Sequence, residues 1–197
     1  MGRLKTYNAD EIATKAMELF WMHGFDGTST QTLVEHMGVN RYSLYAEFGN
    51  KQGLYEAALK VYENNVVSYY FSILETDEAG VQEIKAVIER FANASSDPQS
   101  KRGCFLCNSA TERAAHDAAT NRVVANYIDR ICASFVNALT NMQKNGQLKS
   151  DVNVKEEGSF FAVTLLGFFV LLRSCTGDAV IKSAAQSTLR HLDALLV

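Results

Sequence analysis

The chain has 197 residues, of which 47% are hydrophobic, and a formal net charge of −3 at pH 7. Such a composition is that of a folded globular protein and excludes a disordered chain. The slightly negative balance excludes binding to nucleic acid through overall charge, so any DNA contact has to come from the local placement of basic groups. The single proline, Pro98, favours long uninterrupted helices.

The longest apolar stretch, Phe160 to Leu172, is too short to cross a bilayer and is interrupted by Thr164 and Gly167. We therefore expect a buried helix there and no membrane partner. The first residues contain no apolar run of the kind found in signal peptides. Four cysteines without an export signal indicate reduced thiols, so we predict a cytoplasmic protein rather than one held by disulfides.

Apolar residues recur with a helical period almost everywhere, and no segment alternates convincingly with a period of two. We therefore predict an all-α protein. Four helices are expected in the first third of the chain, with caps or first residues at Asn8, Thr28, Asn40 and Lys51. Gly24 and Gly38 are expected to end the first two. The same period predicts five more helices, near 80–95, 104–116, 119–145, 153–175 and 179–195.

The second and third predicted helices are short, are joined by a glycine turn, and form a helix-turn-helix pattern. Leu44 and Phe48 share the inward side of the third helix, which leaves a polar and aromatic outer side. Periodicity alone does not separate this arrangement from any other small three-helix bundle. The identity of the residues decides between them.

Two segments, residues 24–29 and 37–54, resemble the DNA-binding signature of the tetracycline-repressor family. The spacing of Tyr45, Phe48, Lys51 and Leu54 is its most diagnostic part. The resemblance implies a nine-helix, two-domain repressor, with a helix-turn-helix DNA-binding domain at 1–50 and a ligand-sensing and dimerisation domain at 51–197. It also implies a homodimer on a double-stranded DNA operator, an unknown small-molecule effector, no cofactor and no enzymatic activity.

The expected DNA contacts lie at the start of the second helix, on the third helix and at the start of the fourth. In the major groove, Arg41 can pair with a guanine and Ser43 can donate or accept. Tyr45 is carried over from the family as a phosphate contact, and the ammonium of Lys51 lies where a helix N-terminus also favours phosphate. The full predicted set is Thr28, Ser29, Thr30, Asn40, Arg41, Tyr42, Ser43, Tyr45 and Lys51.

The first 51 residues contain five basic and six acidic side chains. So few cations allow only a few phosphate contacts per subunit, and useful affinity then requires two subunits on a two-fold site.

The predicted helix at 153–175 is apolar almost all round, so it must be buried on several faces at once. One face is expected to meet a partner subunit, as the family implies, together with the last helix. The alternative is a single deep core helix in a monomer. The predicted interface residues are Phe161, Leu165, Phe168, Phe169, Leu172, Leu189 and Leu192.

Cys104, Asn108, Glu112 and His116 recur every four residues, and Cys107 and Thr111 form the neighbouring row. Three interpretations compete: small core cysteines beside a solvated stripe, a sensing thiol favoured by the helix dipole, and a metal site. We predict no metal, because two thiols on one continuous helix do not make a zinc knuckle. The candidate ligand or sensing residues are Cys104, Phe105, Cys107, Asn108, Thr111 and Phe161.

Aromatic residues of the body are candidates either for the wall of an apolar pocket or for the core: Phe91, Phe105, Tyr127, Phe135, Phe160 and Phe161. The pattern favours a neutral or apolar effector over a multiply charged one. Release from DNA is expected when the effector shifts the fourth helix, which runs from Lys51 into the body. Two alternatives remain open at this point: a helical redox protein using the thiols of Cys104 and Cys107, and a helical interaction module without DNA binding.

Overall fold

The computed structural model describes residues 8–94, 97–113, 117–175 and 178–197. All regular elements in these ranges are helices, and one isolated bridge joins Leu148 to Leu196. The helices are α1 (Ala9–His23), α2 (Thr30–Met37), α3 (Arg41–Phe48), α4 (Lys51–Tyr62), α5 (Ser68–Phe71), α6 (Val81–Ala94), α7 (Phe105–Glu112), α8 (Ala118–Lys144), α9 (Val154–Arg173) and α10 (Asp178–Ala194). Short 3-10 turns lie at Ser72–Leu74 and Pro98–Arg102.

Side chains cap each of the first four helices, because the first backbone N–H groups of a helix have no partner within it. Asn8, Asn40 and Asn50 accept from N–H groups in the first turns of α1, α3 and α4. The prediction for α2 was wrong by one residue: Ser29 is the cap and accepts from the N–H of Thr32. Thr28 is instead fully buried, since its hydroxyl donates to the Gly24 carbonyl across the turn.

The fourth helix begins at Lys51, as predicted, which is also where the sensing domain was predicted to begin. Its path is not α-helical throughout, however. A π-helical segment, Glu63–Val67, links α4 to α5, and the residues at both junctions keep right-handed helical angles. These three elements form one continuous rod, so the described residues contain nine helical rods. Such π segments inside α-helices are frequent at functional sites.

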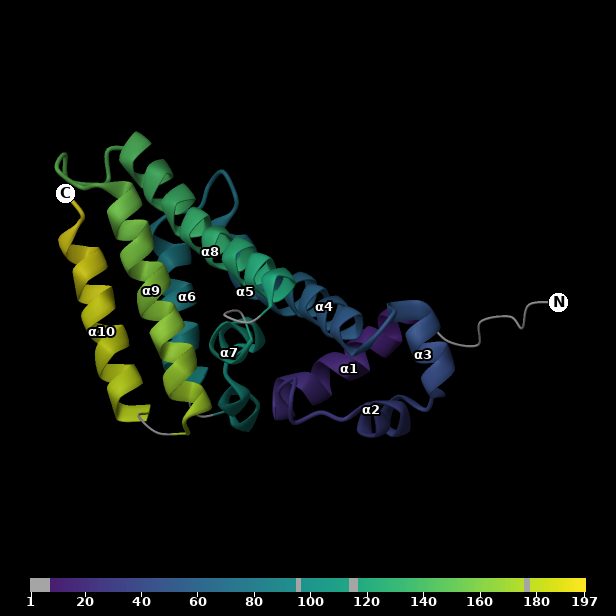
Figure 1. Ribbon diagram of the computed structural model, residues 1–197. Coiled ribbons are helices and arrows are strands. Elements are labelled where there is room, and N and C mark those ends of the chain that lie inside the picture. Colours follow the sequence, from purple (N-terminus) through teal and green to yellow (C-terminus); the bar gives the residue numbers. More distant parts are fainter. Residues whose placement is uncertain (1–7, 95–96, 114–116, 176–177) are drawn as a thin grey trace.

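Figure 1 shows an elongated molecule with α1, α2 and α3 at one end and α10 at the other. The rod that begins with α4 leads from the first end into the body, where α9 lies between α10 and α8, and α6 lies behind them. The predicted helix at 104–116 corresponds to α7, which ends at Glu112. His116 lies outside the described residues. Within the described ranges, none of the helices is both long and apolar enough to cross a membrane.

Most of the residues predicted for the dimer face of α9 and α10 pack inside their own subunit. Phe161 is 1% exposed and stacks on Phe135 at 5.7 Å between ring centroids. The other buried members of the set are Leu165, Phe168, Phe169, Leu172 and, on α10, Leu192; Leu189 is half-buried. An all-round apolar pattern indicates that several faces are covered but not which neighbour covers each one.

The outward side of α9 carries a different apolar stripe. Phe160, Val163 and Val170 are 43%, 66% and 58% exposed, and Gly167 lies between them on the same side. On α10, Val180 is also exposed. The spacing of three, four and three residues keeps the members of the α9 stripe on one helix face. This α9 stripe is an exposed apolar surface of the subunit.

Candidate nucleic-acid interface and ligand cavity

The helix-turn-helix is held by Leu33, Met37 and Leu44, which are buried between α1, α2 and α3. Gly38 ends α2 with φ 68°, a left-handed conformation that favours glycine. The Tyr45 hydroxyl lies 2.7 Å from the Thr30 hydroxyl, so the side of α3 is tied to the start of α2. These contacts fix α3 against α2.

The outer side of α3 presents the predicted base-reading residues. Tyr42 is 85% exposed, and Arg41 is exposed with its guanidinium carbon 5.4 Å from the centroid of the Tyr45 ring. Ser43 is half-buried beside the cap made by Asn40. These side chains stand together on one exposed surface, as a groove-reading helix requires.

The start of α2 departs from the prediction at one position. Ser29 is exposed and Thr30 half-buried, so both hydroxyls lie near the same surface as α3. Thr28 offers no surface to a DNA strand, because its side chain is buried and bonded to Gly24. We therefore leave Thr28 out of the candidate contact set.

Lys51 lies at the junction between this surface and the body. Its ammonium stands 4.2 Å from the centroid of the Phe25 ring, and the guanidinium of Arg113 stands 4.1 Å from the same centroid. Partial burial lowers the pKa of Lys51, with Asp26 opposing and Arg113 adding to the shift. The Phe25 ring therefore contacts two cations, Lys51 at the start of α4 and Arg113 at the end of α7.

A second contact across the junction runs through Gln52, the next residue of α4. Its amide accepts from Arg113 at 3.2 Å and donates to the Asp117 carboxylate at 2.7 Å. Asp117 is also the cap of α8, where it accepts from the N–H of Thr120. The Nε atom of Arg113 is buried without a hydrogen-bond partner among the described residues. We call Phe25, Gln52, Arg113 and Asp117 the joint.

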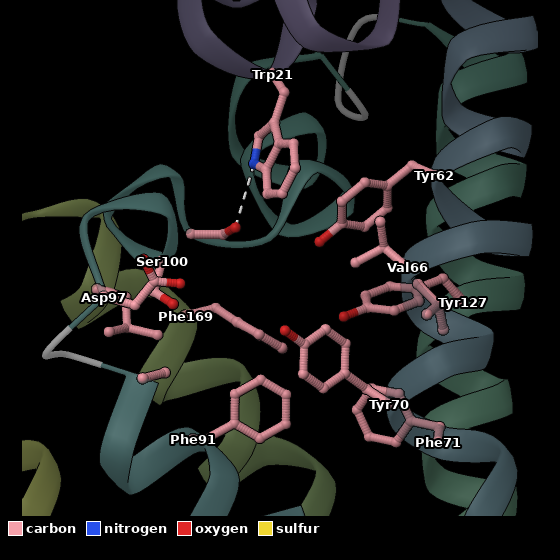
Figure 2. Close-up of a pocket in the computed structure, with 14 residues that line it drawn as sticks. Trp21, Tyr62, Val66, Tyr70, Phe71, Phe91, Asp97, Ser100, Tyr127 and Phe169 are labelled. Atoms are coloured by element: carbon pink, nitrogen blue, oxygen red, sulfur yellow. Dashed lines mark hydrogen bonds between the residues drawn. The ribbon is translucent and has the colours of Figure 1, made fainter. Parts of the chain in front are cut away.

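A cavity of about 100 Å³ lies in the body, beyond the joint along α4 (Figure 2). Its described lining consists of Trp21, Tyr62, Val66, Val67, Tyr70, Phe71, Phe91, Ala94, Asp97, Ser100, Gly103, Tyr127, Phe169 and Leu172. Trp21 comes from α1, and its indole N–H is 3.2 Å from the carbonyl oxygens of Arg102 and Gly103. The cavity therefore touches both the first helix and the rod that carries Lys51.

The two thiols near the start of α7 contact Tyr127, which lines this cavity. Cys104 is buried, with its Sγ 3.1 Å from the Tyr127 hydroxyl, and Cys107 Sγ is 3.9 Å from the same oxygen. Burial raises the pKa of Cys104, but hydrogen bonds from Cys107, Tyr127 and Tyr62 outweigh it and lower the pKa to about 7. The hydrogen bond with Cys104 and burial raise the pKa of Cys107.

The predicted sensing residues are dispersed in the structure. Phe105 packs edge-on against Tyr55 and Tyr62, while Phe161 belongs to the core with Phe135. Asn108 donates to the Arg102 carbonyl, and Thr111 is exposed. Of the aromatic candidates, Phe91 and Tyr127 line the cavity. Within the described ranges, no group of three His, Cys, Asp or Glu side chains is placed to hold a metal ion.

The cavity wall also contains residues that the sequence analysis did not single out. Tyr62, Val66 and Tyr70 follow one another at intervals of four residues along the rod and face the cavity. That interval was visible in the sequence and marks one helix face. Trp21 could not be identified in this way, because its partners in the body, Arg102 and Gly103, are 81 and 82 residues further along the chain.

Comparison with known families gives two matches that together cover most of the chain. Residues 12–58 match the family of bacterial regulatory proteins, tetR family, and residues 80–188 match the tetracyclin repressor-like C-terminal domain. The chain is 29% identical over 151 residues to YezE of Bacillus subtilis, an uncharacterised HTH-type transcriptional regulator, covering 77% of this chain and 78% of YezE. It is 37% identical over 111 residues to the HTH-type transcriptional repressor ComR of Escherichia coli, covering 56% of this chain and 53% of ComR.

Solved structures share the same fold. The regulator CifR, a cysteine mutant complexed with 26-bp double-strand operator DNA, superposes with a TM-score of 0.83 at 23% identity, covering 95% of this chain and 98% of that one. The reduced form of Escherichia coli NemR gives 0.80 at 17% identity and covers 96% of both chains.

Proposed function

Because the chain belongs to the tetracycline-repressor family of bacterial DNA-binding transcriptional regulators, we propose that it is a repressor whose operator affinity is lowered by an effector in the cavity. Members of this family are regulators and not enzymes, which sets the redox-enzyme alternative aside. The same membership also sets aside the alternative of an interaction module without DNA binding, because the family consists of DNA-binding regulators.

In this proposal, α3 of each subunit enters the major groove of one half of a pseudo-palindromic operator. Arg41, Tyr42 and Ser43 read base edges, while Tyr45, Thr30 and Lys51 contact phosphates. The related fold of CifR on a 26-bp operator supports this docking. Because its target is chromosomal DNA, the protein acts in the cytoplasm.

The proposed homodimer forms through the α9 stripe, with α10 beside it. Val163 is the sharpest test position, being two-thirds exposed at the middle of the stripe. Val163→Glu would place two like charges in an apolar contact and is expected to give a folded monomer by analytical ultracentrifugation. Ala125→Glu, on the exposed side of α8, is the matched control and should remain dimeric. A dimeric Val163→Glu variant would contradict this interface.

One observation carries the coupling: a single rod begins at Lys51, next to DNA, and contributes Tyr62, Val66 and Tyr70 to the cavity. We propose that the rod has two positions, one that fits the operator and one that does not. An effector that binds between the rod and Trp21 shifts the equilibrium if it makes better contacts in the second position. A changed tilt of α4 changes the separation of the two recognition helices. Operator affinity then falls, since the half-site spacing no longer fits.

Operator binding is tested by footprinting the DNA that flanks the gene of this protein. The expected result is a protected pseudo-palindrome with half-sites about one helical turn apart. The absence of any protected site, with a folded dimer, would refute the proposal.

The coupling is tested without knowing the effector, by filling the cavity with a protein side chain. Ala94→Phe puts a ring into the cavity wall and is expected to weaken operator binding by about tenfold, whereas Asn93→Phe, on the exposed side of the same helix, should not. Equal operator affinities in the two variants, both folded, would show that the cavity does not communicate with DNA.

A further inference from the structure

The composition of the cavity specifies more than a general effector site. Half of its fourteen described lining residues are aromatic: Trp21, Tyr62, Tyr70, Phe71, Phe91, Tyr127 and Phe169. They come from six different helices and surround the space from several sides (Figure 2). The face of an aromatic ring is electron-rich, and a group of such faces attracts cations.

The charges of the described lining also favour a cationic ligand. Asp97 is the one charged side chain among these residues, which include no Lys, Arg or His. The phenols of Tyr62 and Tyr127 stay neutral, because burial, with Cys104 adding to it, raises the pKa of both well above its usual value. A carboxylate or phosphate effector would lose its hydration here and gain no cationic partner.

Two arginines outside the lining bear on this argument. The guanidinium carbon of Arg102 is 5.5 Å from the centroid of the Trp21 ring, and that of Arg90 is 5.3 Å from the centroid of the Tyr70 ring. They weaken the negative potential of these two rings, whereas Phe91 and Phe169 have no Lys, Arg or His beside them within the described lining.

Size and polarity narrow the ligand further. An apolar protein cavity of about 150 Å³ accepts benzene, so about 100 Å³ limits the enclosed part of a ligand to a small head group such as trimethylammonium. In Figure 2 the hydroxyls of Tyr62, Tyr70 and Tyr127 point into the space, with Asp97 and Ser100 on the opposite side. The lining therefore also offers hydrogen bonds to a short polar tail.

We propose that the cavity is an aromatic cage for a small organic cation, a quaternary or tertiary ammonium compound with a hydroxyl or similar polar group. This inference rests on the proposed effector role of the cavity and names the chemical class of the effector. The aromatic rings surround the ammonium group, the Asp97 carboxylate balances its charge, and the phenols bond the polar tail.

The test compares two probes of the same shape. Choline carries the cationic nitrogen, and 3,3-dimethylbutan-1-ol has a carbon in its place. In calorimetric titrations of the full chain, choline is expected to bind at least about tenfold more tightly than the neutral alcohol. Equal binding, tighter binding of the alcohol, or binding of neither probe would overturn the proposal.

Two variants locate the binding site. Asp97→Asn keeps the shape but removes the charge, and is expected to weaken choline binding several-fold while leaving the alcohol unchanged. Tyr70→Leu removes one ring and should weaken choline further. Its matched control is Tyr69→Leu, since the neighbouring Tyr69 is 66% exposed and is absent from the described lining. If Asp97→Asn and Tyr70→Leu, both with unchanged thermal melting, bind choline as the native chain does, the site is elsewhere and the inference fails.

Operator titrations separate this inference from the proposed function. Choline binding without any operator binding would leave the cage intact and refute the repressor. The opposite outcome is also possible: operator binding is weakened by Ala94→Phe, but the chain binds the neutral alcohol as tightly as choline. That result would support the repressor function and refute the proposal of a cationic effector.

Discussion

The two ends of the molecule differ in where their candidate functional side chains lie: on the surface at one end and in the interior at the other. At the α1–α3 end, Arg41 and Tyr42 are exposed, and the core beneath them is small. In the body, Tyr62 and Tyr127 are buried and line the cavity from within. A partner as large as DNA must be met from outside, whereas a small effector is best bound where water is excluded. The same substitution therefore has different consequences at the two ends.

The joint contains residues of both regions. Phe25 and Gln52 belong to the elements that carry the DNA contacts, while Arg113 and Asp117 lie at the junction of α7 and α8. Contacts between few polar groups are easier to rearrange than a packed core. We therefore propose that a shift of the body reaches the DNA-binding end through the joint.

The largest effect is expected from an aromatic residue of the body core. Phe161→Ala removes a fully buried ring stacked on Phe135, and should lower the free energy of unfolding by about 3–5 kcal/mol. The control is its neighbour Phe160, which is 43% exposed on the α9 stripe. Urea unfolding at one fixed protein concentration, with the oligomeric state recorded, measures both. Equal losses from Phe160→Ala and Phe161→Ala would show that the two faces of α9 are assigned wrongly.

At the DNA-binding end the expected loss is in affinity and not in stability. Arg41→Ala removes an exposed guanidinium, and each half-site then loses about 1–3 kcal/mol of base contact. Fluorescence anisotropy on the footprinted operator should report at least a tenfold weaker complex, with unchanged thermal melting. Arg122→Ala, an exposed arginine on α8, is the control for loss of charge alone. Equal effects of the two substitutions would remove Arg41 from the recognition surface.

The contrast between the ends also explains what the sequence predicts. Caps such as Asn8 and Asn40 act within three residues, so their helices were predicted correctly from local pattern. The one local error, Thr28, arose because its hydroxyl serves the turn that precedes the helix. The DNA-contact set otherwise stays a prediction.

In the body the informative contacts are distant in sequence. The pattern of α9 predicted burial but not which side of the helix meets α8, and Phe161, which was predicted for the dimer face, lies in the core of its own subunit. Trp21 and Arg113 were missed for the same reason, since their partners lie on other helices. Periodicity shows which residues share a face of a helix, but only the packing of the helices decides which neighbour that face contacts.

A smaller effect is expected from loosening the joint. Gln52→Leu removes the amide that links α4 to Arg113 and Asp117. On its own it should change operator affinity by no more than about threefold, but it should reduce the effect of Ala94→Phe, giving a coupling energy of about 1 kcal/mol. Operator titrations of the two single variants and the double variant measure this energy. The control pairs Ala94→Phe with Lys85→Ala, which breaks the ion pair of Lys85 with Asp193 on α10. Additive effects of Gln52→Leu and Ala94→Phe would exclude the joint from the coupling.

The smallest effect concerns a helix start in the body that lacks the caps found at the DNA-binding end. Cys104 precedes α7, makes no capping hydrogen bond and turns its thiol toward Tyr127. Its folded pKa of about 7 lies below the ordinary thiol value of 9.0, so folding favours the thiolate. The resulting stability is absent below about pH 7, grows as the pH rises toward 9, and amounts to about 1 kcal/mol at pH 8. Above pH 9 the raised pKa of Cys107 opposes it, because the unfolded chain then ionises that thiol more readily.

Ultraviolet thiolate absorbance should therefore show one group titrating near pH 7 in the folded protein and missing in Cys104→Ser. Cys175→Ser, which removes an exposed thiol far along the chain, is the control and should leave that titration in place. If the folded protein shows no thiolate below pH 8, burial outweighs the hydrogen bonds of Tyr127 and Cys107. Cys104 would then be an inert core residue, and the body would differ from the DNA-binding end in packing alone.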